Sequence, residues 1–144
     1  MIKHLKKLLK VLIPSLIAIA FIMIYGKYRC DHKDFKDPLE TKLILGLDGW
    51  SMTHVTFFAI LGYMYPEYFW YALLLGVIWE LFEHFYGKSR PGWLGGYGDC
   101  QDIRTDRTDG NWWYGKWTDI VCNIVGFIIG VYLKKGNVKK VFEL

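Results

Sequence analysis

The segment most informative about the fold is WSMTHVTFFAILGYMYPEYFWYALLLGVIWELFEHFY, residues 50–86. It contains two apolar runs, 50–65 and 68–86, which only Pro66 and Glu67 separate. Runs of this kind approach the roughly 17–25 residues that a membrane-spanning helix requires. A proline removes a backbone hydrogen bond and often kinks or ends a helix. The stretch therefore predicts two antiparallel helices joined as a hairpin.

Two further apolar runs, 8–25 and 117–133, flank the hairpin across the longer segments 26–49 and 87–116. We therefore expect residues 1–144 to form one all-α transmembrane domain, a polytopic integral membrane protein with four transmembrane helices. Tyrosines and tryptophans gather near the ends of the runs, as is typical of membrane–water interfaces. The short run at 50–65 leaves a re-entrant helix as an alternative. No small-residue cleavage site follows the first run, which favours an uncleaved signal anchor.

The charge pattern predicts the orientation. The net charge is +4, and lysines cluster at both chain ends, namely Lys3, Lys6, Lys7, Lys10, Lys134, Lys135, Lys139 and Lys140. By the positive-inside rule both termini should be cytosolic, and the loops 26–49 and 87–116 should be outside or lumenal. Charges in the middle of the chain are mixed, so we expect no nucleic-acid partner. In a bacterium the membrane would be the plasma membrane.

Three cysteines are present, without the spacing of a zinc motif. Cys30 and Cys100 fall in the two outer loops, where a disulfide between them could form. Cys122 falls inside the last apolar run, and we expect an ordinary buried thiol there.

Four ionisable residues lie inside the predicted spans: His54, Glu80, Glu83 and Asp119. A charge at the centre of a membrane helix costs roughly 2.5–3.5 kcal/mol. With a rise of about 1.5 Å per residue, all four lie about 6–10 Å below the same outer surface, and Asn123 lies about 12 Å below it. Three helices thus deliver polar groups to one layer, which favours a compensating partner such as a bound metal.

The donor atoms predict which metal. The oxygen donors of Glu80, Glu83, Asp119 and Asn123 suit Ca²⁺, with Mg²⁺ or Mn²⁺ also possible. His54 is then free to act as a general base, because its ordinary pKa lies near neutrality. Two other interpretations stay open: a structural polar network, and a proton or ion path. The apolar cytosolic halves of the spans count against a path.

Glycines accompany the polar residues on two helices. Gly126 and Gly130 continue the stripe of Asp119 and Asn123, and Gly76 precedes Glu80 by one turn. Small residues at this spacing let a neighbouring helix approach closely. The glycines predict tight packing, either within one chain or in a homodimer.

The order and spacing of these residues resemble a known enzyme family. The block His54 … Trp79-Glu80-Leu81-Phe82-Glu83 … Trp112-Trp113 … Asp119 … Cys122-Asn123 resembles the catalytic core of base-exchange phosphatidylserine synthases, over residues 48–133. The resemblance implies a transferase of phosphatidylserine biosynthesis in the endoplasmic reticulum, which replaces the head group of an existing phospholipid with serine in the presence of Ca²⁺. This chain is shorter and lacks several helices of that family.

The resemblance also implies roles for individual residues. His54 matches the catalytic histidine, and Glu80, Glu83 and Asp119 match acidic metal-site positions. Asn123 lies one residue closer to the aspartate than in that family. Apart from the resemblance, Arg90 in the loop 87–116 could meet a lipid phosphate, because arginine suits bidentate phosphate contacts. Trp113 in the same loop is a further candidate for substrate contact.

A second resemblance is looser. Leu61-Gly62 after a histidine, followed by Asp119-x-x-x-Asn123-x-x-Gly126-x-x-x-Gly130, is similar to VanZ-like small membrane proteins. That resemblance implies a membrane protein of non-enzymatic or unknown activity. If water replaced serine or another small alcohol as the nucleophile, the site of His54 and the three acids would make the protein a phospholipase D-type lipid hydrolase.

Overall fold

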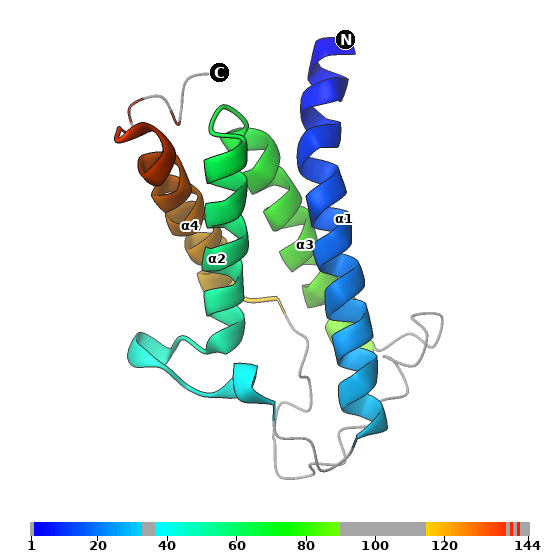
Figure 1. Ribbon diagram of the computed structural model, residues 1–144. Helices are drawn as coiled ribbons and strands as arrows, with labels where there is room; N and C mark the ends of the chain where they lie inside the picture. The colour runs from blue at the N-terminus through cyan, green and yellow to red at the C-terminus, as the bar shows by residue number, and fades with distance from the viewer. Residues whose placement is uncertain (1, 33–36, 90–114, 138, 140, 142–144) are drawn as a thin grey trace.

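The computed structural model describes residues 2–32, 37–89, 115–137, 139 and 141. Four α-helices occur in this part of the chain, α1 (Ile2–Asp31), α2 (Gly49–Met64), α3 (Phe69–Ser89) and α4 (Trp117–Lys135). Two short 3-10 helices, η1 (Pro38–Glu40) and η2 (Ile44–Gly46), lie between α1 and α2. The described residues include no strand, so the predicted all-α class is confirmed. The helices alternate in direction, and α1 begins at the end of the bundle where α4 ends (Figure 1).

The helix ends follow from local chemistry. The Asp48 carboxylate caps α2 by accepting the Ser51 backbone N–H at 2.8 Å. Gly136 ends α4 in the left-handed conformation, with φ 65°. The largest departure from prediction is α1, which extends well beyond 8–25, because apolar length marks a membrane span and not the whole helix. The flanking lysines are themselves good helix formers.

Helices α2 and α4 form the closest pair in the bundle. Gly126 and Gly130 on α4 lie against the backbones of Val55 and Ala59 on α2, and Gly62 on α2 lies against the backbone of Phe127. A Cβ atom at any of these glycines would overlap a carbonyl oxygen of the facing helix. The close helix approach that the glycine stripe predicted is confirmed within one chain.

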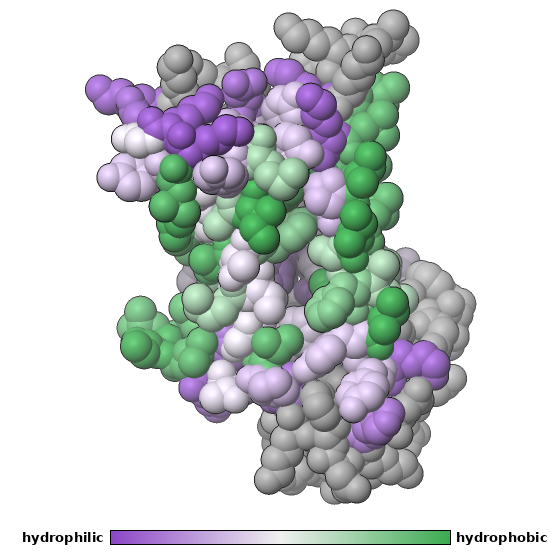
Figure 2. Space-filling view, viewed as in Figure 1, coloured by the Kyte–Doolittle hydropathy of each residue, from purple (hydrophilic) through white to green (hydrophobic). Residues whose placement is uncertain are grey.

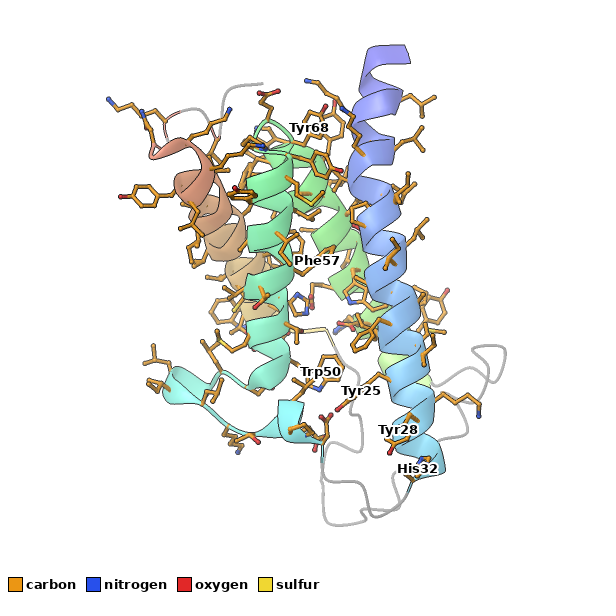
Figure 3. All side chains as sticks on the ribbon, in the orientation of Figure 1. Tyr25, Tyr28, His32, Trp50, Phe57 and Tyr68 are labelled. Atoms are coloured by element: carbon orange, nitrogen blue, oxygen red, sulfur yellow. The ribbon has the colours of Figure 1, made fainter. Side chains whose placement is uncertain are left out.

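The apolar core lies toward the hairpin that joins α2 and α3. Its members are Val11, Phe58, Leu61, Phe69, Ala72, Phe127, Val131 and Val141. Helix α1 packs mainly on α3. Far from the core, buried Asp37 joins α1 to α2 by accepting hydrogen bonds from the Tyr25 hydroxyl (2.6 Å) and from Trp50 Nε1 (3.3 Å). The rings of Tyr25 and Trp50 meet edge to face (Figure 3).

Two helices in the described part of the chain are long and apolar enough to cross a membrane. They cover Lys7–Tyr28 in α1 and Trp117–Lys135 in α4. These two helices are compatible with a membrane location. The sequence predicted more, namely four membrane-spanning helices, and the other two spans stay a prediction.

Candidate metal centre

One donor atom each from His54, Glu80 and Asp119 come together, and all three lie within 4.8 Å of one another. The three residues come from α2, α3 and α4, at the end of the bundle where α2 and α4 begin and α3 ends. Glu80 and Asp119 are buried, at 5% and 4% exposure. The His54 side chain is 15% exposed, so it is the most accessible of the three.

A hydrogen bond to Asn123 orients the His54 ring. His54 Nδ1 lies 2.9 Å from Asn123 Oδ1 and 3.7 Å from Glu80 Oε1. An amide oxygen can only accept, so with this amide orientation Nδ1 carries the proton and Nε2 keeps its lone pair. Gly76 makes room for Asn123, since a Cβ at position 76 would lie 2.7 Å from Asn123 Nδ2. The structure thus gives Asn123 an orienting role toward the predicted base.

Two buried polar atoms at this centre have no hydrogen-bond partner among the described residues: Glu80 Oε1 and Asn123 Nδ2. A buried carboxylate oxygen without a partner is costly, and a bound cation would satisfy it. Two ligands of one Ca²⁺ bonded at about 2.4 Å can be up to about 4.8 Å apart. The spacing and the carboxylate chemistry of the donors therefore fit a divalent cation.

The second oxygen of Glu80 serves the fold. Glu80 Oε2 accepts the backbone N–H of Lys116, the residue that precedes α4, at 2.9 Å. Asp119 lies in the first turn of the same helix. Negative groups at a helix N-terminus stabilise the helix through its dipole. Glu80 and Asp119 therefore also stabilise the start of α4, and this role accounts for part of the negative charge in this layer.

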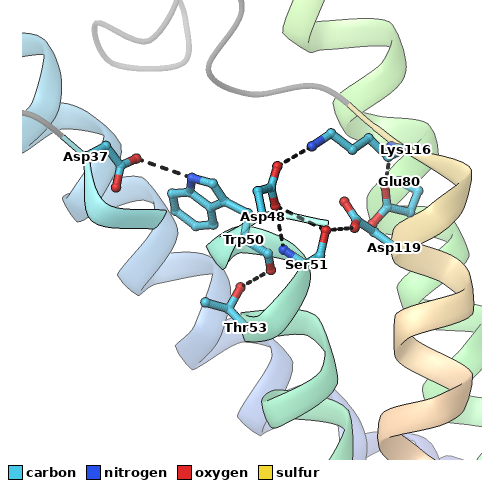
Figure 4. A network of polar contacts seen from close by, with 8 residues as sticks. All are labelled: Asp37, Asp48, Trp50, Ser51, Thr53, Glu80, Lys116 and Asp119. Carbon is cyan, nitrogen blue, oxygen red and sulfur yellow. Dashed lines mark hydrogen bonds and ion pairs between the residues drawn. The ribbon is translucent and has the colours of Figure 1, made fainter. Parts of the chain in front are cut away.

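Ser51 joins this centre to the N-terminus of α2 (Figure 4). Its hydroxyl lies 2.9 Å from Asp119 Oδ1 and 3.1 Å from Asp48 Oδ1. Asp48 already accepts the Ser51 N–H on Oδ1 and pairs with Lys116 Nζ through Oδ2. The Ser51 hydroxyl therefore donates its one proton to Asp119 Oδ1, and this hydrogen bond holds the Asp119 carboxylate in place.

The Asp48–Lys116 ion pair connects the start of α2 to the start of α4. Partial burial opposes the ionisation of Asp48. Hydrogen bonds from the Lys116 ammonium and the Ser51 backbone outweigh that effect and hold the pKa of Asp48 below its ordinary value of 3.8.

The other predicted site residues fall in several places. Glu83 is buried one turn beyond Glu80 but is not a member of the three-residue donor group, and its role as a ligand stays a prediction. His84, the residue after Glu83, is exposed, and Cys122 is the buried free thiol that we expected. Arg90, Trp113 and the predicted Cys30–Cys100 disulfide lie outside the residues and side chains that the structure describes.

Sequence reasoning missed Asp48, Ser51 and Lys116. One signal was available, because Asp-x-x-Ser at the start of an apolar run is an N-cap pattern. That pattern gives the local Asp48–Ser51 contact but not the contact with Asp119, which is 68 residues away. Comparison with protein families, curated proteins and solved structures finds no match to this chain.

Proposed function

We propose that this protein is a membrane-embedded, divalent-cation-dependent enzyme that exchanges the head group of a phospholipid. The single observation that carries the proposal is the convergence of His54, Glu80 and Asp119 around Glu80 Oε1, a buried oxygen with no hydrogen-bond partner among the described residues. A histidine with a basic nitrogen beside a cation site is an arrangement that can activate a hydroxyl group close to a phosphate.

Exposed apolar surface supports a membrane location for all four helices. Figure 2 shows hydrophobic residues in a middle band of the bundle and hydrophilic residues toward its ends. Each helix turns large apolar side chains outward, among them Ile17, Phe21, Ile60, Leu74, Ile78, Phe85, Val121, Val125 and Ile129. Contiguous apolar surface on this scale is uncommon on a water-soluble monomer.

The distribution of charge supports the proposed orientation. Lysines at the start of α1 and the end of α4 lie at one end of the bundle, namely Lys7, Lys10, Lys134, Lys135 and Lys139. A cytosolic location of this end follows the positive-inside rule. Helix α2 has 16 residues and rises about 24 Å, less than a hydrocarbon core of about 30 Å. The bilayer would be thinned around the polar centre at its start.

The chemistry follows from the positions of the donors. In this proposal Glu80 and Asp119 would hold Ca²⁺, with Glu83 as a further candidate ligand. The cation would neutralise the charge of the lipid phosphate. His54 Nε2 removes the proton from the hydroxyl of serine or a similar small alcohol. The alcohol oxygen then bonds to phosphorus, the bond to the original head-group alcohol breaks, and that alcohol leaves with the proton returned from His54.

A structural role is the second candidate, and the bond from Glu80 to the start of α4 favours it. In that case the acids would only tie the three helices together. Glu80→Gln would then lower thermal stability, and no lipid would turn over.

The test uses purified protein in phosphatidylcholine and phosphatidylethanolamine vesicles with Ca²⁺ and radiolabelled serine. We expect labelled phosphatidylserine that disappears without Ca²⁺ and in His54→Ala. Exposed His84→Ala is the matched control and should keep activity. The absence of product, or a product that survives His54→Ala, contradicts head-group exchange. Release of free head group without serine incorporation identifies a hydrolase instead.

A further inference from the structure

An aliphatic loop projects from the bundle just before α2. Residues 43–47 read Leu-Ile-Leu-Gly-Leu. Ile44 is 82% exposed and Leu45 is 93% exposed, the two highest values among the large hydrophobic residues described. Figure 2 shows hydrophobic atoms standing clear of the bundle at the lower left, where Figure 1 places η2.

The backbone holds this loop in a fixed shape. Lys42 and Asp48 form an isolated antiparallel bridge at its base, and the Leu43 N–H donates to the Leu47 carbonyl at 2.7 Å. Leu45 has φ 62° and ψ 23°, in the left-handed region that favours glycine. A leucine at such a position carries a backbone cost that glycine would avoid. The fold gives no reason for a leucine at position 45. A contact of the Leu45 side chain with something outside the protein would give one.

We propose that the 43–47 loop inserts into the outer or lumenal leaflet as a lipid-contacting wedge. The loop leads directly into α2, at the end of the bundle where Trp50 and the 75% exposed Trp117 lie. Tryptophans of this kind mark the membrane interface. An aliphatic tip that projects sideways at this level meets acyl chains next to the head groups, while Lys42 can extend back to water.

Continuity with neighbouring apolar surface favours lipid as the occupant. Met52 in the first turns of α2 is 42% exposed, and Leu43 at the edge of the loop is 47% exposed. The loop residues 43–47 carry no charged or hydrogen-bonding side chain that would specify a protein partner. The proposal uses the membrane location argued above and is independent of the metal centre.

The test measures the reaction of single cysteines with a water-soluble maleimide in phosphatidylcholine nanodiscs, where both membrane faces are accessible. The three native cysteines are replaced by serine, and Leu45→Cys is compared with Thr41→Cys and Phe21→Cys. Thr41 is exposed two residues before the loop, and Phe21 is an outward, 61% exposed residue of α1. We expect Leu45→Cys and Phe21→Cys to react at least 10-fold more slowly than Thr41→Cys, and a nitroxide-labelled lipid to quench a fluorophore at position 45.

The outcomes separate the two claims. Fast reaction at both positions 21 and 45 contradicts the membrane location itself. Protection at position 21 with fast reaction at position 45 contradicts the wedge alone. Protection at position 45 without quenching by the labelled lipid, or with crosslinking between two copies through position 45, also overturns the wedge, because protein would then cover the loop.

Discussion

Replacing Gly126 with alanine should pull α2 and α4 apart. A Cβ at this position would overlap the Val55 carbonyl oxygen and would lie 2.9 Å from Val55 Cα. Carbon atoms normally pack at about 3.5–4.0 Å, so the helices must separate by about 0.5–1 Å. Overpacking against rigid backbone costs about 3 kcal/mol, at the upper end of the usual range. The helix propensity of alanine returns about 1 kcal/mol, which leaves a net destabilisation of about 2 kcal/mol.

The same separation should damage the candidate metal centre. The bonds from His54 to Asn123 and from Ser51 to Asp119 are both 2.9 Å long and both join α2 to α4. A further 0.5–1 Å, the separation estimated above, takes them beyond the usual limit of about 3.2 Å. Ca²⁺ affinity should therefore fall by about 10-fold or more, as it does when groups that orient metal ligands are lost.

The assay is thermal unfolding in detergent followed by circular dichroism, with and without Ca²⁺. Val125→Ala is the control, because this residue is adjacent on α4 but 45% exposed. The explanation of the helix pair is refuted if Gly126→Ala unfolds at the same temperature as the control, or above it.

Three further predictions concern the polar network. Ser51→Ala should weaken Ca²⁺ binding by about 10–100-fold in isothermal titration calorimetry. Thr53→Val removes a hydroxyl that, among the described residues, donates a 2.6 Å hydrogen bond to the Trp50 carbonyl of its own helix, and it should leave binding unchanged. Equal Ca²⁺ affinities of the two variants would contradict the role of Ser51. Because the pKa of Asp48 is lowered from 3.8, its ion pair should stabilise the fold fully above about pH 4, and this stability should be lost as the pH falls through the lowered value. Lys116→Met should flatten that acid limb in pH-dependent unfolding, and an unchanged limb would count against the pair. Asp37→Asn should loosen α1 and speed amide hydrogen exchange near its C-terminal end but not in α4. An unchanged exchange rate at this end of α1, or an equal increase in α4, would show that the Asp37 contact does not anchor α1.

The helices could be predicted from the sequence because each is a long apolar run. Runs at 50–65 and 117–133 give α2 and α4 to within one or two residues at each end. The ends of α1 could not be placed in this way, because its first turns are rich in lysine and fall outside the apolar window. Local composition determines these elements, so little tertiary information was needed.

The candidate site was only partly predictable, for a related reason. Depth along each helix placed His54, Glu80 and Asp119 in one layer, and the structure brings their donor atoms together. Rotation about the helix axis decides finer partners, such as Asn123 beside His54. Lys116 could not be found from sequence, because a lysine in a connecting segment has no periodicity and its contacts depend on how α2, α3 and α4 meet.

Calorimetric titration of the purified protein with Ca²⁺, compared between Glu80→Gln and Glu67→Gln, tests directly whether the buried acids bind a cation. Both variants remove one carboxylate from α3 or the turn before it, but Glu67 is exposed near the opposite end of α3. We expect saturable binding of one Ca²⁺, weakened about 10-fold or more by Glu80→Gln and unchanged by Glu67→Gln. Absence of binding in the unmodified protein, or equal binding by both variants, would contradict a metal centre held by Glu80 and Asp119 beside His54.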